Sequence, residues 1–564
     1  MSTKKNTTFF KVAFSIGVIL LLGFTAGGLA KLLAFFNTGS DRATMLNLVP
    51  DISNEYTPKV NWLPDEGETG RKMESFNRQI VARDYVRALY QRNLALLTAD
   101  TSGIMEYYTI DARPKVYSLV NSINKRERAI ERAELNHNLK LHFYSADGQL
   151  VSFTDYNVES RQRIIDISNK NERVFSNVDI ANFEVLMQLV DGYWRIKHLI
   201  RNKGELGKYR QKLMNEAISD AKLQRINKIR GINYYPQKTP WKDFWIKYDE
   251  EVIEKDLQKI KKLRLNTVRV FVNYEQFGKG NVVPEMLERL EHFLDNASKS
   301  GIGVLVTLFD FNSNYQLLNF PATDRQLETI LTRFKSHPAV IAWDLKNEPD
   351  LDFHYQNEAD VKEWLNLMVR QAKIYDPTTP ITIGWAYPES ADHLAEKLDF
   401  ISFHYYREVD QLGGVIDSLK KQLGAKPLLL EEFGLSSYES SVLPISITPY
   451  EQAKHLSEIQ RILFDRGNVP YIYWTLYDFE NVGANIAGNR PWQRNAQKHF
   501  GLIDTYNQPK PVAGVISRRT IPTDPGILDK IPLYLINYAL IGVIFAAAFV
   551  YLPFFRKLFR KHKN

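Results

Sequence analysis

Between residues 226 and 520 the sequence repeats one pattern, a short apolar run followed by a stretch whose apolar residues have helical spacing. Continuous apolar strands that alternate with helices are typical of a parallel sheet covered on both faces. Eight such units over roughly 250 residues match the size of a closed (β/α)8 barrel. We therefore predict an α/β fold, with a TIM barrel at 226–520. The predicted strands are Lys228–Tyr234, Thr267–Val272, Gly303–Leu308, Val340–Leu345, Ile381–Gly384, Phe400–His404, Pro427–Glu432 and Tyr471–Trp474.

Polar and aromatic residues gather at the C-terminal ends of these predicted strands. In a TIM barrel that end carries the active site, whereas the preceding residues of each strand are core. A retaining glycosidase needs two carboxylates about 5 Å apart, one as acid/base and one as nucleophile. Glu348 and Glu432 end two different strands and could form such a pair. The strand ends hold Arg269, Asn347, Glu348, His404, Tyr406, Glu432 and Trp474.

Six segments of the predicted barrel resemble a clan A glycoside hydrolase of family 5, the cellulase and mannanase type. The Asn-Glu-Pro triplet alone is a weak signal. Its order and spacing relative to the His-x-Tyr and Glu-Phe-Gly motifs make the set specific. The segments are LNTVRVFV (265–272), SHPAVIAWDLKNEP (336–349), DFISFHYY (399–406), KPLLLEEFG (426–434), YIYWTLYDF (471–479) and FGLIDTYNQPKP (500–511).

The resemblance implies distinct roles for the two carboxylates. Glu348 would be the general acid/base, with a raised pKa, and Glu432 would be the nucleophile. Arg269 would lie beside Glu432 and keep it ionised, because an adjacent guanidinium lowers the pKa of a carboxylate. Glu431 competes for the nucleophile role, but side chains alternate along a strand, so only one of the two can point into the barrel mouth. The family pattern places the nucleophile directly before the aromatic residue, which favours Glu432.

The resemblance also implies residues that bind the substrate. Asn347 would hydrogen-bond the 2-hydroxyl of the reacting sugar, Tyr406 would hydrogen-bond the nucleophile, and His404 would line the subsite. Trp474 would form the floor on which the sugar stacks, and Trp385 after the fifth strand is a further candidate platform. Aromatic residues in loops could add sugar platforms, namely Trp241, Trp245, Tyr315 and Trp492.

One position departs from the family pattern. Many family 5 endoglucanases have a histidine at the end of the third strand, where this chain has Phe309 followed by Asp310. The departure concerns the contacts to the sugar and not the two-carboxylate mechanism. The chain has no cysteine and no metal, phosphate or dinucleotide motif, so we predict neither a metal nor an organic cofactor.

Residues 73–200 are predicted to form a separate α+β domain after a linker at 37–72. A helix over 76–97 precedes two hairpin signals, Ala146–Gln149 and Asp191-Gly192. A helix followed by a curved antiparallel sheet resembles the nuclear-transport-factor-two-like cone, which implies a spacer or docking module. Residues 201–225 would connect this domain to the barrel as a helix.

Two charge-free apolar segments predict a two-pass membrane protein. Val12–Ala30, within an N-terminal anchor at 1–36, and 531–555 are long enough to span a bilayer, although the first could be a cleaved signal peptide. The basic residues before the first segment and in the tail 556–564 account for the whole net charge of +8. The positive-inside rule places both termini in the cytoplasm and the body outside the inner membrane. Because the body is neutral, the composition does not indicate nucleic-acid binding.

These features together predict a membrane-anchored retaining β-glycosidase. It would cleave or transglycosylate a β-glucan-like or β-mannan-like polysaccharide or oligosaccharide by double displacement. The alternative is a non-catalytic, glycan-binding component of a polysaccharide synthesis or export complex, with a membrane glycosyltransferase or export protein as partner. The presence of both glutamates favours the enzyme, since loss of catalysis usually leaves one of the pair replaced.

Overall fold

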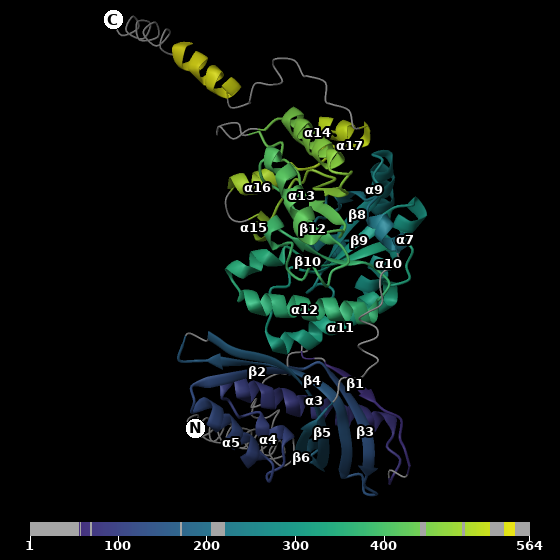
Figure 1. Ribbon diagram of the computed structural model, residues 1–564, viewed down its shortest axis with the longest axis vertical. Coiled ribbons are helices and arrows are strands. Elements are labelled where there is room, and N and C mark those ends of the chain that lie inside the picture. Colours follow the sequence, from purple (N-terminus) through teal and green to yellow (C-terminus); the bar gives the residue numbers. More distant parts are fainter. Residues whose placement is uncertain are drawn as a thin grey trace, which may run out of the picture. The chain divides into compact units, whose positions relative to one another are not determined.

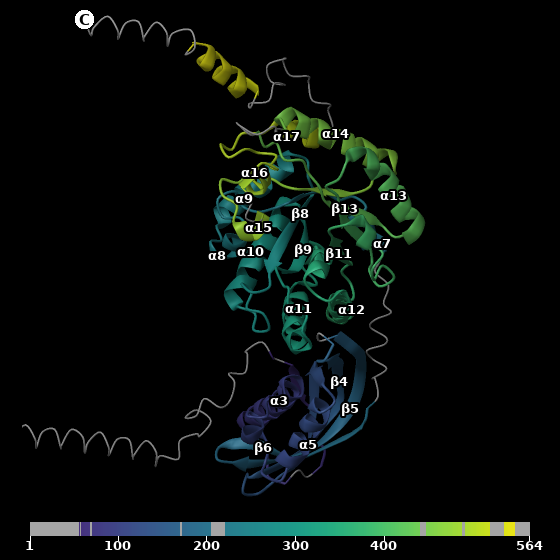
Figure 2. The same ribbon diagram turned by 90° about the vertical axis from the view of Figure 1, so that its left-hand side faces the viewer.

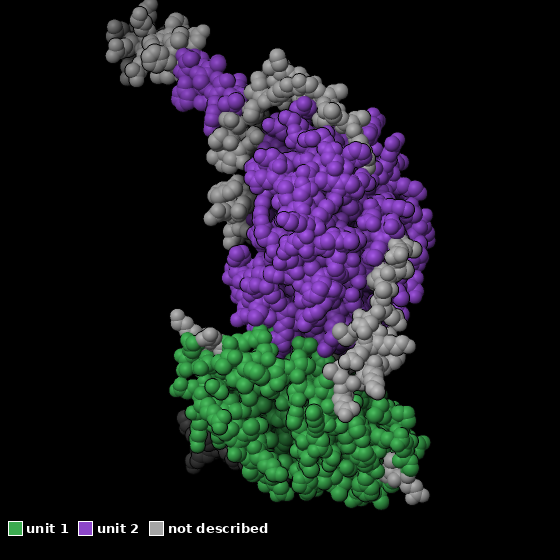
Figure 3. Space-filling model, viewed as in Figure 1, with its two compact units in different colours: residues 1–205 green, residues 206–564 purple. Residues whose placement is uncertain are grey.

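The chain forms two compact units in the computed structural model (Figure 1), residues 1–205 and residues 206–564 (Figure 3). An open sheet lies in the first unit and a closed barrel in the second. The predicted N-terminal anchor lies outside the described residues. The structure describes residues 56, 58–67, 70–169, 172–204, 220–439, 447–487, 491–518 and 535–547.

In its described residues, the first unit is a six-stranded sheet with three helices. The strands follow the order β1-β3-β4-β5-β6, with β2 paired to β4. All pairs are antiparallel except β1 with β3. Gly148 and Gly192 have positive φ in the tight turns between β3 and β4 and between β5 and β6. The elements are β1 (Lys59–Trp62), α3 (Ser75–Thr98), α4 (Ile104–Tyr107), α5 (Arg113–Asn124), β2 (Arg128–Glu134), β3 (Asn136–Tyr144), β4 (Leu150–Asp166), β5 (Glu172–Val190) and β6 (Tyr193–Lys203).

Helix α3 packs its apolar residues against the sheet, with Leu89 and Phe153 in a shared core. The buried polar groups of this unit contact one another. The Nδ1 atom of His137 lies 2.6 Å from Oδ2 of Asp155, and the guanidinium of Arg92 lies 3.1 Å from Oε1 of Glu134. The arrangement is that of an α+β domain, and its relation to the transport-factor family stays a prediction.

Eight parallel strands close into a barrel in the second unit, which confirms the predicted TIM barrel. Each strand pairs with the next along the chain, and β14 pairs back with β7. The strands are almost wholly buried because helices cover their outer face (Figure 2). They are β7 (Arg230–Asn233), β8 (Thr267–Asn273), β9 (Gly303–Asp310), β10 (Val340–Asn347), β11 (Ile381–Trp385), β12 (Ile401–His404), β13 (Leu428–Glu432) and β14 (Tyr471–Tyr473).

The helices around the barrel bury one apolar stripe each. In α10, Leu287, Leu290 and Leu294 recur at helical spacing and are buried. Helix α14 begins at a capping box, in which Thr448 and Glu451 satisfy each other's backbone N–H groups. The main helices are α7 (Asp220–Ile226), α8 (Lys242–Ile246), α9 (Glu250–Lys262), α10 (Pro284–Ser300), α11 (Phe320–Phe334), α12 (Glu358–Tyr375), α13 (Val409–Leu423), α14 (Pro449–Asp465), α15 (Ala484–Ala487), α16 (Pro491–Gln497) and α17 (Pro511–Arg518).

The predicted two-pass membrane topology is not borne out. Among the described residues, no helix combines the length and the apolar character needed to span a bilayer. The predicted second span, 531–555, contains a described helix only over 535–547. The prediction of an inner-membrane protein with a periplasmic body is therefore corrected.

Candidate active site

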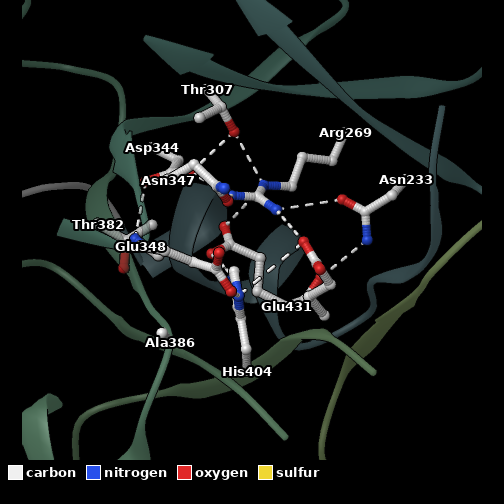
Figure 4. Close-up of polar contacts among 12 residues, drawn as sticks. Asn233, Arg269, Thr307, Asp344, Asn347, Glu348, Thr382, Ala386, His404 and Glu431 are labelled. Carbon is white, nitrogen blue, oxygen red and sulfur yellow. Dashed lines mark hydrogen bonds and ion pairs between the residues drawn. The ribbon is translucent and has the colours of Figure 1, made fainter. Parts of the chain in front are cut away.

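Arg269 lies at the centre of the polar residues inside the barrel mouth (Figure 4). Its side chain is fully buried, and its guanidinium contacts residues from four other strands. A buried guanidinium needs this number of acceptors, because its charge is costly to remove from water. It donates hydrogen bonds to Thr307 Oγ1 (2.8 Å), Asn233 Oδ1 (3.2 Å), Asp344 Oδ2 (2.7 Å), Asn347 Oδ1 (2.9 Å) and Glu432 Oε2 (3.1 Å).

Glu432 ends strand β13, and its carboxylate accepts two hydrogen bonds. The guanidinium of Arg269 contacts Oε2, and the hydroxyl of Tyr406 donates to Oε1 at 2.7 Å. The carboxylate is therefore held from two sides while one face remains open to a cavity. This is how a nucleophilic carboxylate needs to be oriented, because attack requires a fixed oxygen with a free lone pair.

Glu348 follows strand β10 in an unusual backbone conformation. Its φ and ψ are 48° and 49°, in the left-handed region that residues other than glycine rarely adopt. The backbone N–H of Glu348 donates to the carbonyl of Gly384 at 2.7 Å, which holds this turn. Its Oε1 atom lies 2.9 Å from Nδ1 of His404. Strained backbone held in place at a strand end is common at functional sites.

The two carboxylates lie close together at the barrel mouth. One oxygen of Glu348, one of Glu432 and one ring nitrogen of His404 all lie within 4.8 Å of one another. Carboxyl groups in retaining glycosidases lie about 5–5.5 Å apart, against about 6.5–9.5 Å in inverting enzymes. The three groups could by distance also hold a cation. The guanidinium of Arg269 already supplies positive charge to Glu432, which opposes a second cation there.

The directions of the pKa shifts differ from those that the sequence predicted. Burial and the charge of Glu348 raise the pKa of Glu432 above its usual value, against the opposing effects of His404 and Arg269. Burial also acts to raise the pKa of Glu348, but the hydrogen bond and charge of His404 lower it overall. The surrounding carboxylates outweigh burial at His404 and raise the pKa of the imidazole to about 10. At neutral pH the proton near Glu348 therefore resides on His404.

Glu431 lies deeper in the barrel than Glu432 and is fully buried. Its two oxygens lie 3.6 Å from Nε of Arg269 and 3.6 Å from Nε2 of His404. A Cβ atom on Gly384 would come within 2.6 Å of the Glu431 carboxylate, so only glycine fits in β11 at that point. Burial raises the pKa of Glu431. Glu432, not Glu431, lines the cavity.

A cavity of about 650 Å³ opens above the two carboxylates. One wall is aromatic, with Trp474 packed edge-on to Tyr235 and Phe271 at 6.3 Å between ring centroids. Another wall is polar and carries charged groups from β9, β10 and the turn after β10. The main lining residues are Tyr235, Trp241, Phe271, Asp310, Phe311, Asn312, Lys346, Asn347, Glu348, Asp352, Tyr406, Glu432, Trp474, Ile486 and Phe500.

The structure gathers most of the predicted site residues, but not all at the cavity surface. Arg269 and His404 lie behind the carboxylates and contact them from below, so His404 does not line the subsite as predicted. Trp385 is fully buried, and its ring packs against His393 at 5.6 Å between centroids, outside the cavity. The prediction of Trp385 as a sugar platform is corrected for this reason. The cavity is lined by Asn347, Glu348, Tyr406, Glu432 and Trp474.

Three charged residues of the polar wall were not predicted from the sequence as site residues, namely Asp310, Lys346 and Asp352. The ammonium of Lys346 lies 3.3 Å from Oδ2 of Asp352, which also accepts a hydrogen bond from Tyr315. Burial raises the pKa of Asp310 to about 7, although the nearby charges of Lys346 and Arg269 act to lower it. The available signals were the position of Asp310 at a strand end and of Lys346 directly before Asn347.

Known proteins match part of the chain. Residues 246–461 match the family model described as the TIM barrel domain of glycosyl hydrolases family 2. The chain is 25% identical over 235 residues to a β-glucuronidase of Chlorocebus aethiops, covering 38% of this chain and 34% of that protein. A β-glucuronidase of Paenibacillus borealis is 25% identical over 210 residues, covering 34% of this chain and 33% of that protein. The chain thus spans about a third of the length of the curated relatives it matches.

Solved structures also match the chain, at low identity and with TM-scores below 0.5. An exo-β-1,4-mannosidase from Opitutaceae bacterium strain TAV5 has a TM-score of 0.42 and 20% identity, covering 52% of this chain and 60% of that chain. A β-galacturonidase from Eisenbergiella tayi has a TM-score of 0.41 and 16% identity, covering 71% of this chain and 73% of that chain.

The predicted TIM barrel is confirmed, and the sequence matches are to glycoside hydrolases. The matching family model is that of family 2, whereas the motifs of the sequence resemble family 5.

Proposed function

We propose that this protein is a retaining β-glycosidase that acts by double displacement on a β-linked glycan. The observation that carries the proposal is the carboxylate pair, with Glu348 and Glu432 within 4.8 Å of each other at one cavity. That spacing suits direct attack by one carboxylate and is shorter than the separation of about 6.5–9.5 Å in inverting enzymes.

In the first step, an oxygen of Glu432 attacks the anomeric carbon and the bond to the leaving oxygen breaks. Arg269 and Tyr406 orient Glu432 for this attack. Glu348 protonates the leaving oxygen. His404, which is protonated at neutral pH and lies 2.9 Å from Glu348, supplies the proton through their hydrogen bond when substrate displaces water from the site.

In the second step, a water or a sugar hydroxyl attacks the glycosyl-enzyme, and Glu348 accepts its proton as a base. Water gives hydrolysis and a sugar hydroxyl gives transglycosylation. Asn347 accepts a hydrogen bond from Arg269 through Oδ1, so its amide NH2 group is left to donate to a sugar hydroxyl in the cavity. Trp474 offers an aromatic face on the opposite wall.

The hydrogen bond from Tyr406 to Glu432 predicts that removing the hydroxyl changes the pH dependence of kcat/KM. Glu432 must be ionised to attack, and the hydrogen bond from Tyr406 acts to lower its raised pKa. Removing that hydroxyl raises the pKa further, so less Glu432 is ionised at a given acidic pH. Tyr406→Phe is expected to move the acid limb of the kcat/KM profile to higher pH by about one unit. The measurement is kcat/KM against pH on an aryl β-glycoside.

The neighbouring residue provides a matched control for this experiment. The hydroxyl of Tyr405 donates to the backbone carbonyl of Glu408 at 2.6 Å and does not contact either carboxylate. Tyr405→Phe should therefore leave the acid limb where the wild type has it. Equal shifts of the acid limb in the two variants would show that this limb does not report the ionisation of Glu432.

The charges around the cavity favour a neutral sugar, as in a β-glucan or β-mannan. Among the described lining residues, four carboxylates face one ammonium group, and that ammonium is already paired with Asp352. A uronic acid would bring a further carboxylate into this wall and be repelled. The β-glucuronidases that match the barrel act on a differently charged sugar by their names. The carboxylates are Asp310, Glu348, Asp352 and Glu432.

A substrate panel tests both the activity and the sugar. The full-length protein is assayed with 4-nitrophenyl β-glycosides of glucose, mannose, glucosamine and glucuronic acid. We expect kcat/KM for a neutral sugar to exceed that for the glucuronide by at least about tenfold, the equivalent of roughly 1.4 kcal/mol. A preference for the glucuronide would reject the neutral-sugar assignment and make Lys346 the carboxylate-binding group. Absence of turnover on every substrate, including soluble β-glucan and β-mannan, would favour the non-catalytic glycan-binding alternative.

A further inference from the structure

A second cavity of about 580 Å³ adjoins the catalytic cavity. The two cavities share Trp241 and Ile486, so one continuous surface leads from the carboxylates past the indole into the second cavity. The second cavity is lined by the loop between β7 and α8 and by the loop after β14. Both loops extend from the catalytic ends of their strands, where the substrate binds. Their side chains include Gln237, Lys238, Asp243, Glu480 and Asn481.

Trp241 is fixed in position between the two cavities. Its ring packs against Phe479 at 4.8 Å and against Tyr235 at 5.9 Å between centroids, and its side chain remains partly exposed. Its φ and ψ are 52° and −121°, a conformation that an aromatic residue adopts only when its surroundings hold it. A rigid, half-exposed indole at the junction of two cavities is suited to stack on the apolar face of a sugar ring.

The place of the second cavity around the barrel indicates which part of the substrate it takes. In the closed ring of eight strands, β14 lies opposite β10. Glu348 follows β10 and, by the proposed mechanism, protonates the leaving oxygen, so the leaving group lies on the β10 side. Glu432 ends β13, the neighbour of β14. The second cavity, next to β14 and β7, therefore lies on the side of the sugar that stays bound to the enzyme.

We propose that this second cavity binds a further sugar of the glycone side, with Trp241 as its platform, so that the protein acts on a glycone of two or more sugars and not only on a single terminal one. The glycone that fills the two cavities together is a neutral β-linked saccharide of at least two units. Its hydroxyls match a lining of mixed amide, ammonium and carboxylate groups, which would suit neither an apolar ligand nor one of a single charge. This inference rests on the glycosidase function proposed above.

The test compares substrates that differ by one sugar on the glycone side. The full-length protein is assayed for nitrophenol release from 4-nitrophenyl β-glucoside and β-cellobioside, and from 4-nitrophenyl β-mannoside and β-mannobioside. We expect kcat/KM for the better disaccharide to exceed that for its monosaccharide by at least about tenfold. In Trp241→Ala this ratio should fall to near one. Trp241→Phe keeps an aromatic face, and its ratio should lie between those of the wild type and Trp241→Ala.

Tyr506→Ala is the control, because Tyr506 is 84% exposed and lines neither cavity. Its ratio should equal that of the wild type. A wild-type ratio near one with normal turnover of the monosaccharides would overturn the second subsite and leave the glycosidase function standing. A high ratio that persists in both Trp241 variants would overturn the placement at this cavity. Absence of all turnover would reject the proposed function and this inference with it.

Discussion

Replacing Glu432 with glutamine is expected to lower kcat on aryl β-glycosides by about 10⁴-fold or more. The amide keeps the shape of the side chain and can still contact Arg269, but it has no anionic oxygen to form the glycosyl-enzyme bond. Losses of this size are typical when the nucleophile of a covalent mechanism is removed. The measurement is single-turnover and steady-state release of nitrophenol, with folding checked by thermal unfolding.

The acid/base residue should behave differently from the nucleophile. In Glu348→Gln, kcat/KM should fall strongly for an alkyl or sugar leaving group. It should fall little for 2,4-dinitrophenol, which leaves without protonation. Added azide should restore turnover of the dinitrophenyl substrate, because an anionic nucleophile needs no base to attack the glycosyl-enzyme and form a glycosyl azide of retained configuration. Azide should not restore Glu432→Gln by this route.

The exposed Glu389 provides a matched control for both variants. It forms a surface ion pair with Arg407 at 2.6 Å, and it does not line the catalytic cavity. Glu389→Gln should retain wild-type kcat. If Glu432→Gln kept more than about a hundredth of the activity while Glu431→Gln lost it, the nucleophile would be Glu431 and the assignment of roles would be wrong.

The barrel could be predicted from the sequence because its strands are buried on both faces. A strand such as β13 then begins as an apolar run, Leu428–Leu430, and ends where the polar residues begin. The same register argument placed Asn347, Glu348 and Glu432 at one end of the barrel, since parallel strands end on the same rim. The bounds were less well predicted, as for the first strand, which the structure confines to Arg230–Asn233.

The contacts between strand ends could not be predicted from the pattern. Trp385 ends a strand as Glu432 does, but its ring turns outward from the cavity to His393, and no spacing rule distinguishes the two cases. The pKa directions depended on His404 lying 2.9 Å from Glu348, a distance between two strands that the sequence does not contain. The pairing of Lys346 with Asp352 likewise arises from the turn after β10.

Replacing Arg269 with methionine is expected to destabilise the barrel by roughly 3–5 kcal/mol. Arg269 is the charged partner of Asp344, Glu431 and Glu432, and all of these side chains are buried. Removing it takes the guanidinium from Asp344 and leaves Glu431 and Glu432 to the imidazolium of His404, which costs far more than the loss of a surface pair. The measurement is unfolding of the full-length protein, in which Tm should fall by the order of 10 °C.

The loss of stability in Arg269→Met should depend on pH, and this dependence identifies the buried carboxylates as its cause. Burial already raises the pKa of Glu431 and Glu432, and removing the guanidinium raises both further. A group whose pKa is higher in the folded state stabilises the fold at low pH and loses that contribution as pH rises through the folded pKa. The Arg269→Met variant should therefore be closer to the wild type at pH 5 than at pH 8.

Arg333→Ala is the matched control, because Arg333 forms an exposed ion pair with Glu291 at 2.6 Å. It should change the free energy of unfolding by less than about 1 kcal/mol at either pH. If Arg269→Met were as stable as the control at pH 8, the buried carboxylates would have to be neutral without the guanidinium. Arg269 would then not be the counter-charge on which the fold depends at pH 8, and this prediction would be wrong.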